Sequence, residues 1–214
     1  MKKKNNKLKA NLVNSDFSIK GECAISLLLT KLDIINIELS MELDRNVIQM
    51  KTGRMKSYES TCKKMDRKGI EKTFSNALEK VNDLIGVRAV CSYMDDIYRI
   101  AEIFSEQKDV KIVKVKDYIK NPKPNGYRSY HMIVEIPVFF AKGKTPMRVE
   151  LQIRTNGMDF WATLEHQLRY KKGIEEMPGY EEISEELLHS VRVVIEADNE
   201  MQRIKDKIGM FHEI

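Results

Sequence analysis

The chain has 214 residues, of which 42% are hydrophobic and 32% charged, and its formal net charge is +5. This length and composition fit one compact domain with a core of ordinary size. The three cysteines are odd in number and show no Cys-X-X-Cys spacing, which argues against a disulfide framework. We therefore expect a protein of the reducing cytoplasm.

The sequence also argues against membrane insertion and secretion. The most apolar stretch, residues 23–43, is interrupted by four charged residues and does not fit a hydrophobic membrane span. The lysines at positions 2–4 lead into polar residues rather than into the apolar core of a signal peptide. We expect a soluble protein without a membrane partner.

Charge is distributed unevenly along the chain. Residues 1–20 hold six lysines and one aspartate, so the basic segment 1–22 is predicted to be a flexible, solvated tail rather than a nucleic-acid arm. Residues 51–72 carry eight basic and three acidic side chains, whereas 175–200 carry nine acidic residues and one arginine. The basic cluster predicts a partner with concentrated negative charge.

The first predicted helix lies in segment 23–50. Leu28, Leu32, Ile35 and Leu39 recur at helical spacing, so this helix is amphipathic. Its apolar face is either part of the core or a contact between subunits, and the core is the more common answer.

A second helix is predicted between residues 57 and 68. Lys56, Lys64 and Arg67 follow one face of it, and Arg54 lies just before it. A charged helix face is often only solvated, but these cations also fit a phosphate-binding surface.

Strands and helices then alternate. Stretches rich in β-branched and aromatic residues are predicted as strands at 85–91, 110–119, 127–139 and 147–154, and helices are expected at 95–106, 156–171 and 181–206. This order predicts an α/β (α+β) fold in which helices flank a mixed sheet.

The last predicted strand alternates apolar and polar residues. Arg148, Glu150, Gln152 and Arg154 share its polar face, which either faces solvent or forms the floor of a site. Asp83 directly precedes the strand at 85–91. If the fold brings Asp83 and Glu150 together, they supply the oxygen ligands that Mg²⁺ prefers when it is shared with phosphates.

A turn-forming run at residues 120–131 leads into the third strand. Tyr127 and His131 share a face, and Lys123 and Arg128 lie near them. An exposed tyrosine beside cations can stack on a base while the cations meet phosphates. A hairpin tyrosine packed on its neighbours is the equally open alternative.

Seven short motifs occur in an order and spacing that resemble the synthetase domain of the RelA/SpoT family. They are Arg54-Met-Lys-Ser57, Lys64-Met-Asp-Arg-Lys68, Asp83-Leu-Ile-Gly-Val-Arg88, Lys116-Asp-Tyr-Ile119, Asn125-Gly-Tyr-Arg-Ser-Tyr-His131, Glu150-Leu-Gln-Ile-Arg-Thr155 and Asp159-Phe-Trp-Ala-Thr-Leu-Glu-His166. The match spans about residues 54–171, and the short chain is similar to the single-domain small alarmone synthetases.

The resemblance implies a nucleotidyltransferase-like sheet and a synthetase core at residues 51–175, followed by an acidic helical segment at 176–214. It implies transfer of pyrophosphate from ATP to the 3′-hydroxyl of GDP or GTP, which makes (p)ppGpp and releases AMP. Glu150 is implied to orient or deprotonate that hydroxyl, with Mg²⁺ held by Asp83 and Glu150.

The resemblance also implies the two nucleotide sites. The residues implied for ATP are Arg54, Lys56, Lys64, Arg67 and Arg88. The residues implied for GDP or GTP are Lys116, Lys123, Tyr127, His131, Asp159 and Glu165, with Tyr127 stacking on guanine. Lys116 and Asp159 stand where other members carry Arg and Asn, so the preference between GDP and GTP stays open.

Two alternatives remain at this stage. One is a toxin-like relative that pyrophosphorylates the 3′ end of tRNA, and the other is an RNA-binding regulator with a vestigial site. No His-Asp pair of a metal-dependent phosphohydrolase is evident, so no alarmone hydrolysis is expected. Members of the family also resemble one another in forming closed tetramers through terminal helices, and an allosteric nucleotide is possible.

Overall fold

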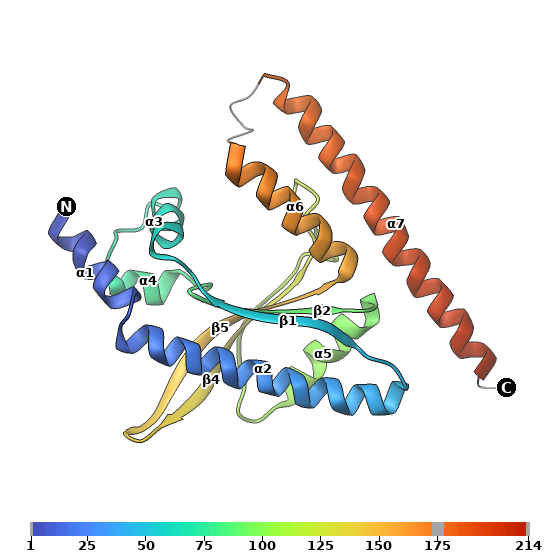
Figure 1. The fold of residues 1–214 in the computed structure, drawn as a ribbon, viewed down its shortest axis with the longest axis horizontal. Coiled ribbons are helices and arrows are strands. Elements are labelled where there is room, and N and C mark those ends of the chain that lie inside the picture. Colours follow the sequence, from blue (N-terminus) through green and yellow to red (C-terminus); the bar gives the residue numbers. More distant parts are fainter. Residues whose placement is uncertain (1, 173–177, 213–214) are drawn as a thin grey trace.

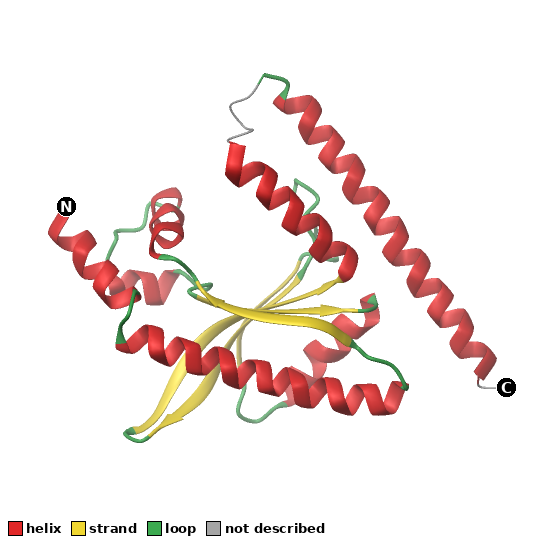
Figure 2. Ribbon diagram, in the orientation of Figure 1, coloured by secondary structure: helices red, strands yellow, loops and turns green. Residues whose placement is uncertain are grey.

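The computed structural model describes residues 2–172 and 178–212, which form one mixed sheet flanked by helices (Figures 1 and 2). In chain order the elements are α1 (Lys2–Leu12), α2 (Asp16–Leu43), β1 (Ile48–Met55), α3 (Tyr58–Arg67), α4 (Phe74–Lys80), β2 (Ile85–Cys91), α5 (Met94–Glu106), β3 (Lys111–Asp117), β4 (Tyr130–Phe140), β5 (Gly143–Thr155), α6 (Asn156–Lys172) and α7 (Tyr180–His212). The predicted fold class is confirmed.

The described residues form a five-stranded sheet in the order β1-β2-β5-β4-β3. Only β2 and β5 pair in parallel, and the other neighbours are antiparallel. The chain segment between β2 and β5 contains α5, β3 and β4. In the strand order the parallel pair nevertheless lies inside the sheet, with β1 on one side and β4 and β3 on the other. Residues at the ends of β2 and β5 are thereby brought close although they are far apart in sequence.

One face of the sheet packs against α2 and forms the main core. Leu28, Leu32 and Ile35 of α2 are fully buried against residues such as Val87 of β2 and Leu151 of β5. The helix begins with a capping box at Ser15, whose hydroxyl accepts the amide of Ser18. The apolar stripe predicted for this helix is therefore part of the core.

The basic amino-terminal segment is ordered in part, where the sequence predicted a flexible tail. In α1, Leu8 and Leu12 are buried against Met65 of α3 and Ala77 of α4. This small apolar cluster fixes α1 beside α3, as Figure 1 shows. Two apolar residues four positions apart are a weak signal among lysines, which explains why the helix was not predicted.

Two further elements, β1 and α4, were not predicted. β1 is an edge strand in which only Ile48 is buried, and its sequence lacks the apolar alternation of a half-buried strand. Gly53 of β1 is required by packing, since a Cβ at this position would lie 2.2 Å from Cγ2 of Ile25 in α2. A glycine thus lets β1 approach the long helix.

On the opposite side of the sheet from α2, Figure 1 shows α3 and α6, with α7 running along α6. Trp161 and Ala162 of α6 are buried together with Val191 of α7. Within the part of the chain that the structure describes, no helix combines the length and the apolar character needed to cross a membrane.

Candidate active site

Polar side chains from neighbouring strands meet on the sheet face opposite to α2. Strand pairing sets Arg88 of β2 beside Gln152 of β5. The same row continues from Gln152 to His131 of β4, and from His131 to Lys116 of β3. Directly paired residues point to the same face of a sheet. We call this surface, which also carries Glu150 and Arg154, the polar face.

The neighbouring row of the polar face contains a gap. Arg54 of β1 pairs with Gly86 of β2, and Gly86 pairs with Glu150 of β5. Gly86 has no side chain, and a Cβ built there would meet only the carbonyl oxygen of Arg54, at 3.9 Å. Space for a ligand therefore remains at Gly86, between Arg54 of β1 and Glu150 of β5.

Glu150 is buried on the polar face, with only 7% of its surface exposed. One carboxylate oxygen lies 3.4 Å from Nδ1 of His131, and the other accepts a hydrogen bond of 2.8 Å from Nε2 of Gln152. Burial alone raises the pKa of Glu150, but the hydrogen bonds from His131 and Gln152 outweigh it and hold the pKa below its usual value. Glu150 is therefore ionised at neutral pH.

His131 connects Glu150 to Tyr127. Its pKa is lowered by burial first, and also by the nearby charges of Arg154 and Lys123, so the imidazole is neutral at pH 7. The hydroxyl of Tyr127 lies 2.9 Å from Nε2 of His131 and accepts a hydrogen bond of 2.6 Å from Arg154. The network assigns the proton of His131 to Nδ1, where it faces Glu150.

Asp83 lies at the entrance of β2, between two of the predicted cations. Its carboxylate oxygens are 3.1 Å from Nζ of Lys56 and 2.8 Å from Nζ of Lys64. Burial raises the pKa of Asp83, but the two lysines outweigh burial and bring the pKa below its usual value. The structure thus joins Asp83 to Lys56 and Lys64, two of the cations that the sequence placed on one helix face.

The predicted metal ligands fit a magnesium ion that is shared with phosphates. Asp83 precedes β2 and Glu150 lies level with Gly86 of β2, close enough for the charge of Asp83 to raise the pKa of Glu150. Among the described residues, no group of three or more His, Cys, Asp or Glu side chains could hold a metal ion. Two carboxylates suffice for Mg²⁺ when phosphates complete its shell.

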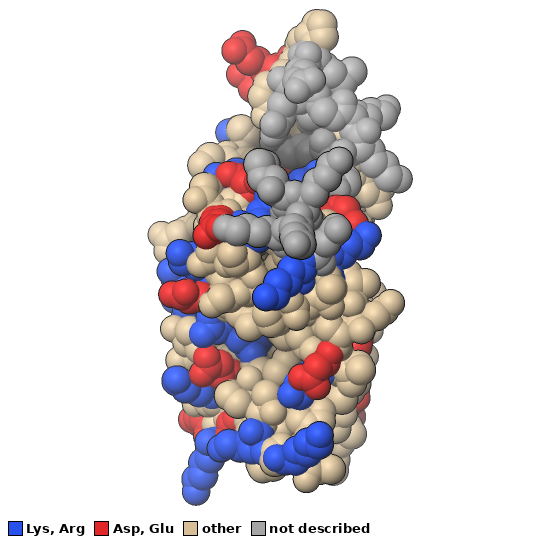
Figure 3. Space-filling model, turned by 90° about the vertical axis from the view of Figure 1, so that its left-hand side faces the viewer, with Lys and Arg blue, Asp and Glu red and all other residues tan. Residues whose placement is uncertain are grey.

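Cations from separate elements converge on the same region. The pKa of Lys123 is lowered by partial desolvation first and then by the charges of Lys116, Lys64 and Arg67, whereas Glu150 opposes the shift. Lys116 and Lys123 belong to β3 and the following loop, while Lys64 and Arg67 belong to α3. Figure 3, viewed from the side that carries α1 and α3, shows Lys and Arg side chains grouped around hollows of this surface.

Arg88 has spare hydrogen-bonding capacity. One terminal nitrogen lies 2.9 Å from Asp159 of α6, but its Nε is buried without a hydrogen-bond partner among the described residues. Buried donors are nearly always paired in proteins, so an unpaired one on a polar face fits an anionic ligand. Arg54 and Arg67 are exposed on the same side of the sheet.

The ring of Tyr127 lies between two cations. Nζ of Lys123 is 4.4 Å from the ring centroid, and the guanidinium carbon of Arg154 is 5.2 Å from it. The half-buried ring also packs edge-on against Tyr118 and His131. Both alternatives for this tyrosine thus stay open, because the ring also packs against the cluster of Trp161, Ala162 and Val191 while the exposed Lys123 lies over it.

Two acidic residues of α6 hold other parts of the site. Asp159 is paired with Arg88 and Arg154 at 2.9 Å each, so it fixes two guanidinium groups over the polar face. Glu165 is buried and accepts a hydrogen bond of 2.9 Å from Asn125, two residues before Tyr127. The structure therefore places both predicted residues at the site, each bonded to a basic or amide side chain.

Arg148 pairs with Glu135 and Arg154 with Asp159, so neither of these arginines pairs with Glu150. One expectation about neighbours was wrong. The sequence placed Arg128 beside Tyr127 as a cation that could meet phosphates, but in the structure Arg128 contacts the sulfur of Met94 in α5. Paired strands and helix packing, which local spacing does not reveal, decide these partners.

The sequence assigned no functional role to three residues that help to build the site. Gln152 and Arg154 are bonded to Glu150 and Tyr127, and Asn125 is bonded to Glu165. The alternation in the last strand had placed Gln152 and Arg154 on its polar face, which was the available signal. Asn125 carried only a turn-forming signal.

A mixed sheet whose polar face brings the ionised Glu150 together with cations from several elements defines a protein that binds nucleotide polyphosphates. The comparisons with known proteins agree with this class. Residues 53–175 match the region found in RelA and SpoT proteins, and the chain belongs to the RelA/SpoT family.

Similar proteins align over most of the chain. The chain is 40% identical to GTP pyrophosphokinase YwaC of Bacillus subtilis over 185 residues, which cover 86% of this chain and 87% of the relative. It is 35% identical to GTP pyrophosphokinase YjbM of the same organism, with coverage of 90% and 88%. Small alarmone synthetase 1 from Bacillus subtilis, solved with its product pppGpp, superimposes with a TM-score of 0.81 at 34% identity, covering 90% of this chain and 96% of that one.

Proposed function

We propose that this protein is a GTP pyrophosphokinase, which transfers pyrophosphate from ATP to the 3′-hydroxyl of GDP or GTP, giving (p)ppGpp and AMP. The observation that carries the proposal is the ionised, buried Glu150 on a face that also presents cations from α3, β2 and β3. The relatives named GTP pyrophosphokinase and the product-bound synthetase support the same reaction. They give no support to the alternative acceptor, the 3′ end of tRNA.

The ATP site is assigned to the basic side of α3 and to the edge of the sheet. Lys56 and Lys64 already lie against Asp83, where they can meet the triphosphate, and Arg67 extends the same helix face. Arg54 and Arg88 flank the gap at Gly86. Guanidinium groups bind phosphate oxygens in pairs, which suits them to fix the transferred group.

Mg²⁺ is the proposed cofactor, held by Asp83 and Glu150 together with substrate phosphates. When bound, the ion neutralises charge that develops on the phosphate oxygens. Asp83 and Glu150 are both ionised, so they are ready to accept it. Lys56 and Lys64 hold Asp83 at the entrance of β2 and keep its orientation.

The acceptor site is assigned to the loop before β4 and to the helix α6. Guanine stacks on the face of Tyr127 after displacing Lys123, which then turns toward the acceptor phosphates together with Lys116. His131, Asp159 and Glu165 line this side. A lysine offers a point charge rather than a planar fork, so Lys116 holds a phosphate less rigidly than an arginine.

Glu150 is the proposed catalytic base. The 3′-hydroxyl gives its proton to the Glu150 carboxylate, and its oxygen forms a bond to the β-phosphorus of ATP. The bond from the β-phosphorus to the oxygen that bridges it to the α-phosphorus breaks, and this oxygen leaves with AMP. The neutral His131 and Gln152 donate hydrogen bonds to the carboxylate and fix its direction.

We also propose a homo-oligomer, a tetramer by resemblance, in the cytoplasm. Exposed apolar side chains form a row on α6, at Phe160, Leu164 and Leu168, and others such as Ile204 and Ile208 lie on α7. Rows of this kind fit subunit contacts. The three cysteines are free, which fits a reducing compartment. The domain assignment is a core at 51–175 with helical segments at 23–50 and 176–214, and any allosteric nucleotide remains a proposal.

The test is a product assay with labelled ATP and, in separate reactions, GDP, GTP and bulk tRNA. The proposal expects labelled guanosine tetra- or pentaphosphate and AMP in equal amounts, and loss of product on chelation of the metal. Product on tRNA alone would establish the alternative acceptor. If the protein binds nucleotides but gives no product in any of these reactions, the result would favour the RNA-binding regulator with a vestigial site. Analytical ultracentrifugation of the same sample measures the oligomeric state.

A further inference from the structure

One face of α7 contacts the acceptor side and then, further along the helix, α5. Apart from the adjacent pair Ser190 and Val191, the residues of this face follow one another at steps of three or four, as one side of a helix requires. They are Leu187, Ser190, Val191, Val194, Asp198, Gln202 and Lys205. Since α7 lies behind α6 rather than on the polar face, none of them was predicted to take part in the site.

Two glycines let α7 approach the acceptor side very closely. Gly126, with φ +85, precedes Tyr127, and a Cβ there would lie 2.5 Å from Cγ1 of Val191. At Gly157 in the first turn of α6, a Cβ would lie 2.8 Å from both Oδ1 of Asp198 and Cγ1 of Val194. The helix therefore touches both the loop that carries Tyr127 and the start of α6.

Asp198 is bonded to the start of α6. Its carboxylate accepts a hydrogen bond of 2.6 Å from the hydroxyl of Thr155, which is itself buried. The same hydroxyl accepts the backbone amide of Met158 at 3.1 Å, as the capping residue of a helix does. Asp198 thus fixes the residue that caps α6, one turn before Asp159.

Asp198 also faces the loop before β4. Burial raises the pKa of the Asp198 carboxyl, while the hydroxyl of Thr155 and the positive charge of Arg128 lower it. Arg128 follows Tyr127 directly in the chain, and one of its terminal nitrogens is buried without a partner among the described residues. Arg128 is therefore a charged neighbour of Asp198, whereas the hydrogen bond of Asp198 is to Thr155 at the cap of α6.

We propose that Asp198 is a positioning residue for the acceptor nucleotide, acting through its hydrogen bond to Thr155 on the start of α6 while α7 packs against the loop that carries Tyr127. The proposal rests on the acceptor site proposed above. Asp198 does not touch a substrate. It positions the start of α6 beside the loop before β4, and its link to the ATP side is indirect, through the ion pair of Asp159 with Arg88.

The test measures KM for GDP and for ATP separately in Asp198→Ala. We expect KM for GDP to rise about tenfold, equivalent to about 1.4 kcal/mol, while KM for ATP stays within about twofold. Asp198→Asn keeps an acceptor for Thr155 but loses the charge that faces Arg128, so its KM for GDP should be intermediate. If Asp198→Ala does not fold, Asp198→Asn alone carries the test.

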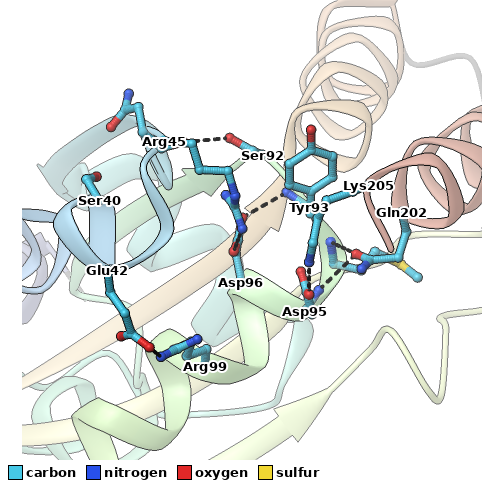
Figure 4. Close-up of polar contacts among 12 residues, drawn as sticks. Ser40, Glu42, Arg45, Ser92, Tyr93, Asp95, Asp96, Arg99, Gln202 and Lys205 are labelled. Carbon is cyan, nitrogen blue, oxygen red and sulfur yellow. Dashed lines mark hydrogen bonds and ion pairs between the residues drawn. The ribbon is translucent and has the colours of Figure 1, made fainter. Parts of the chain in front are cut away.

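Gln202→Ala is the matched control, one turn further along the same face of α7. The side-chain oxygen of Gln202 accepts the backbone amides of Met94 and Asp95 at the start of α5, and Lys205 is paired with Asp95 there (Figure 4). This contact attaches α7 to α5 without reaching the acceptor side. Gln202→Ala should lower the thermal midpoint as Asp198→Ala does, but leave KM for GDP within about twofold of wild type.

The results that overturn the proposal are distinct from those that overturn the acceptor site. Equal changes of both KM values in Asp198→Ala, or a loss of kcat that only follows the fraction of folded protein, would make Asp198 a purely structural residue. Tyr127→Ala, measured in the same assay, tests the site itself. A raised KM for GDP in Tyr127→Ala with none in Asp198→Ala refutes only the role of Asp198, and no change in Tyr127→Ala refutes the acceptor site.

Discussion

At the scale of single residues, the polar face combines burial with charge. Glu150 is nearly inaccessible to solvent and still ionised, because His131 and Gln152 donate hydrogen bonds to it. Tyr127 and Arg154 extend this network away from the carboxylate. A buried network in which each member has a partner fixes orientation, which is what a catalytic base needs.

Glu150→Gln tests whether this carboxylate acts in the reaction. The change keeps the shape of the side chain and removes its charge, so a lost general base should lower turnover by at least about 10²-fold. The thermal midpoint should change little. Product formation and thermal unfolding are measured on the same sample, and a folded variant with nearly normal activity would exclude Glu150 from the mechanism.

Tyr127→Ala and Tyr127→Phe separate the ring from the hydroxyl. Loss of the ring should weaken GDP binding by roughly 1–3 kcal/mol and leave ATP binding nearly unchanged. Phenylalanine keeps the ring but deprives His131 and Arg154 of their shared partner, so GDP binding should be retained while turnover falls several-fold. Calorimetry with each nucleotide checks this, and an equal loss of ATP affinity would contradict the stacking role.

The lowered pKa of His131 predicts a pH dependence of stability. The unfolded histidine takes up a proton near its ordinary pKa of about 6.5, whereas the folded one resists protonation, because burial and the charges of Arg154 and Lys123 outweigh the opposing effect of Glu150 on its pKa. The unfolded state therefore binds more protons below that pH, and the free energy of unfolding falls as the pH drops. The stability that the neutral imidazole contributes is present above about pH 6.5 and is lost in more acidic solution.

Urea unfolding of wild type and His131→Asn at about pH 7.5 and 5.5 measures this contribution. Wild type should lose more stability than the variant on going to the lower pH. Equal losses would show that His131 titrates in the folded protein as it does in the unfolded chain.

At the scale of elements, a close contact between β1 and α2 sets the edge of the sheet. Gly53 faces Ile25, and no side chain fits between them. This contact places Arg54 next to the gap at Gly86, because Arg54 is the following residue of β1 and pairs with Gly86. The position of one predicted ATP ligand thus depends on the packing of a helix on the other face of the sheet.

Gly53→Ala should destabilise the protein by about 1–3 kcal/mol, because its Cβ forces β1 and α2 apart. Gly86→Ala is the matched control in the adjacent strand, where the added Cβ would find only a contact of 3.9 Å. Its thermal midpoint should stay close to that of wild type. Similar losses in both variants would indicate a general cost of replacing glycine rather than a clash.

At the scale of the whole molecule, the proposed acceptor side and the proposed ATP side are built from different parts of the chain around one central strand pair. The proposed acceptor side consists of the loop before β4, α6 and α7, and the proposed ATP side consists of β1, α3 and the start of β2. Glu150 on β5 lies between them. In the proposed function this arrangement would bring two nucleotides to a single carboxylate, as transfer between them requires.

We predict that the protein makes the alarmone but does not degrade it. Hydrolysis in a metal-dependent phosphohydrolase needs a His-Asp pair that the sequence does not contain. Purified guanosine tetraphosphate incubated with the protein and Mn²⁺ or Mg²⁺ should release no pyrophosphate, in a preparation active in synthesis. Metal-dependent release above the level of a Glu150→Gln control would contradict this prediction.

The sequence by itself determined the strands β2 to β5, the core stripe of α2 and the family, because each depends on local periodicity or on motifs in a fixed order. It also identified Asp83 and, separately, Lys56 and Lys64 as candidate site residues, but only the structure shows that they form ion pairs with one another. The folding of residues 2–12 and the strand β1 were not predicted, since burial of Leu8 and the edge position of β1 depend on distant segments.

Only the tertiary structure decided the partners of the charged groups. Register across the parallel pair β2 and β5 set Glu150 level with Gly86, and the packing of α6 gave Arg154 to Asp159 rather than to Glu150. Asp198 reaches Thr155 from 43 positions away in the chain. Such contacts arise from how elements pack after they form, so the pattern of neighbouring residues along the chain does not predict them.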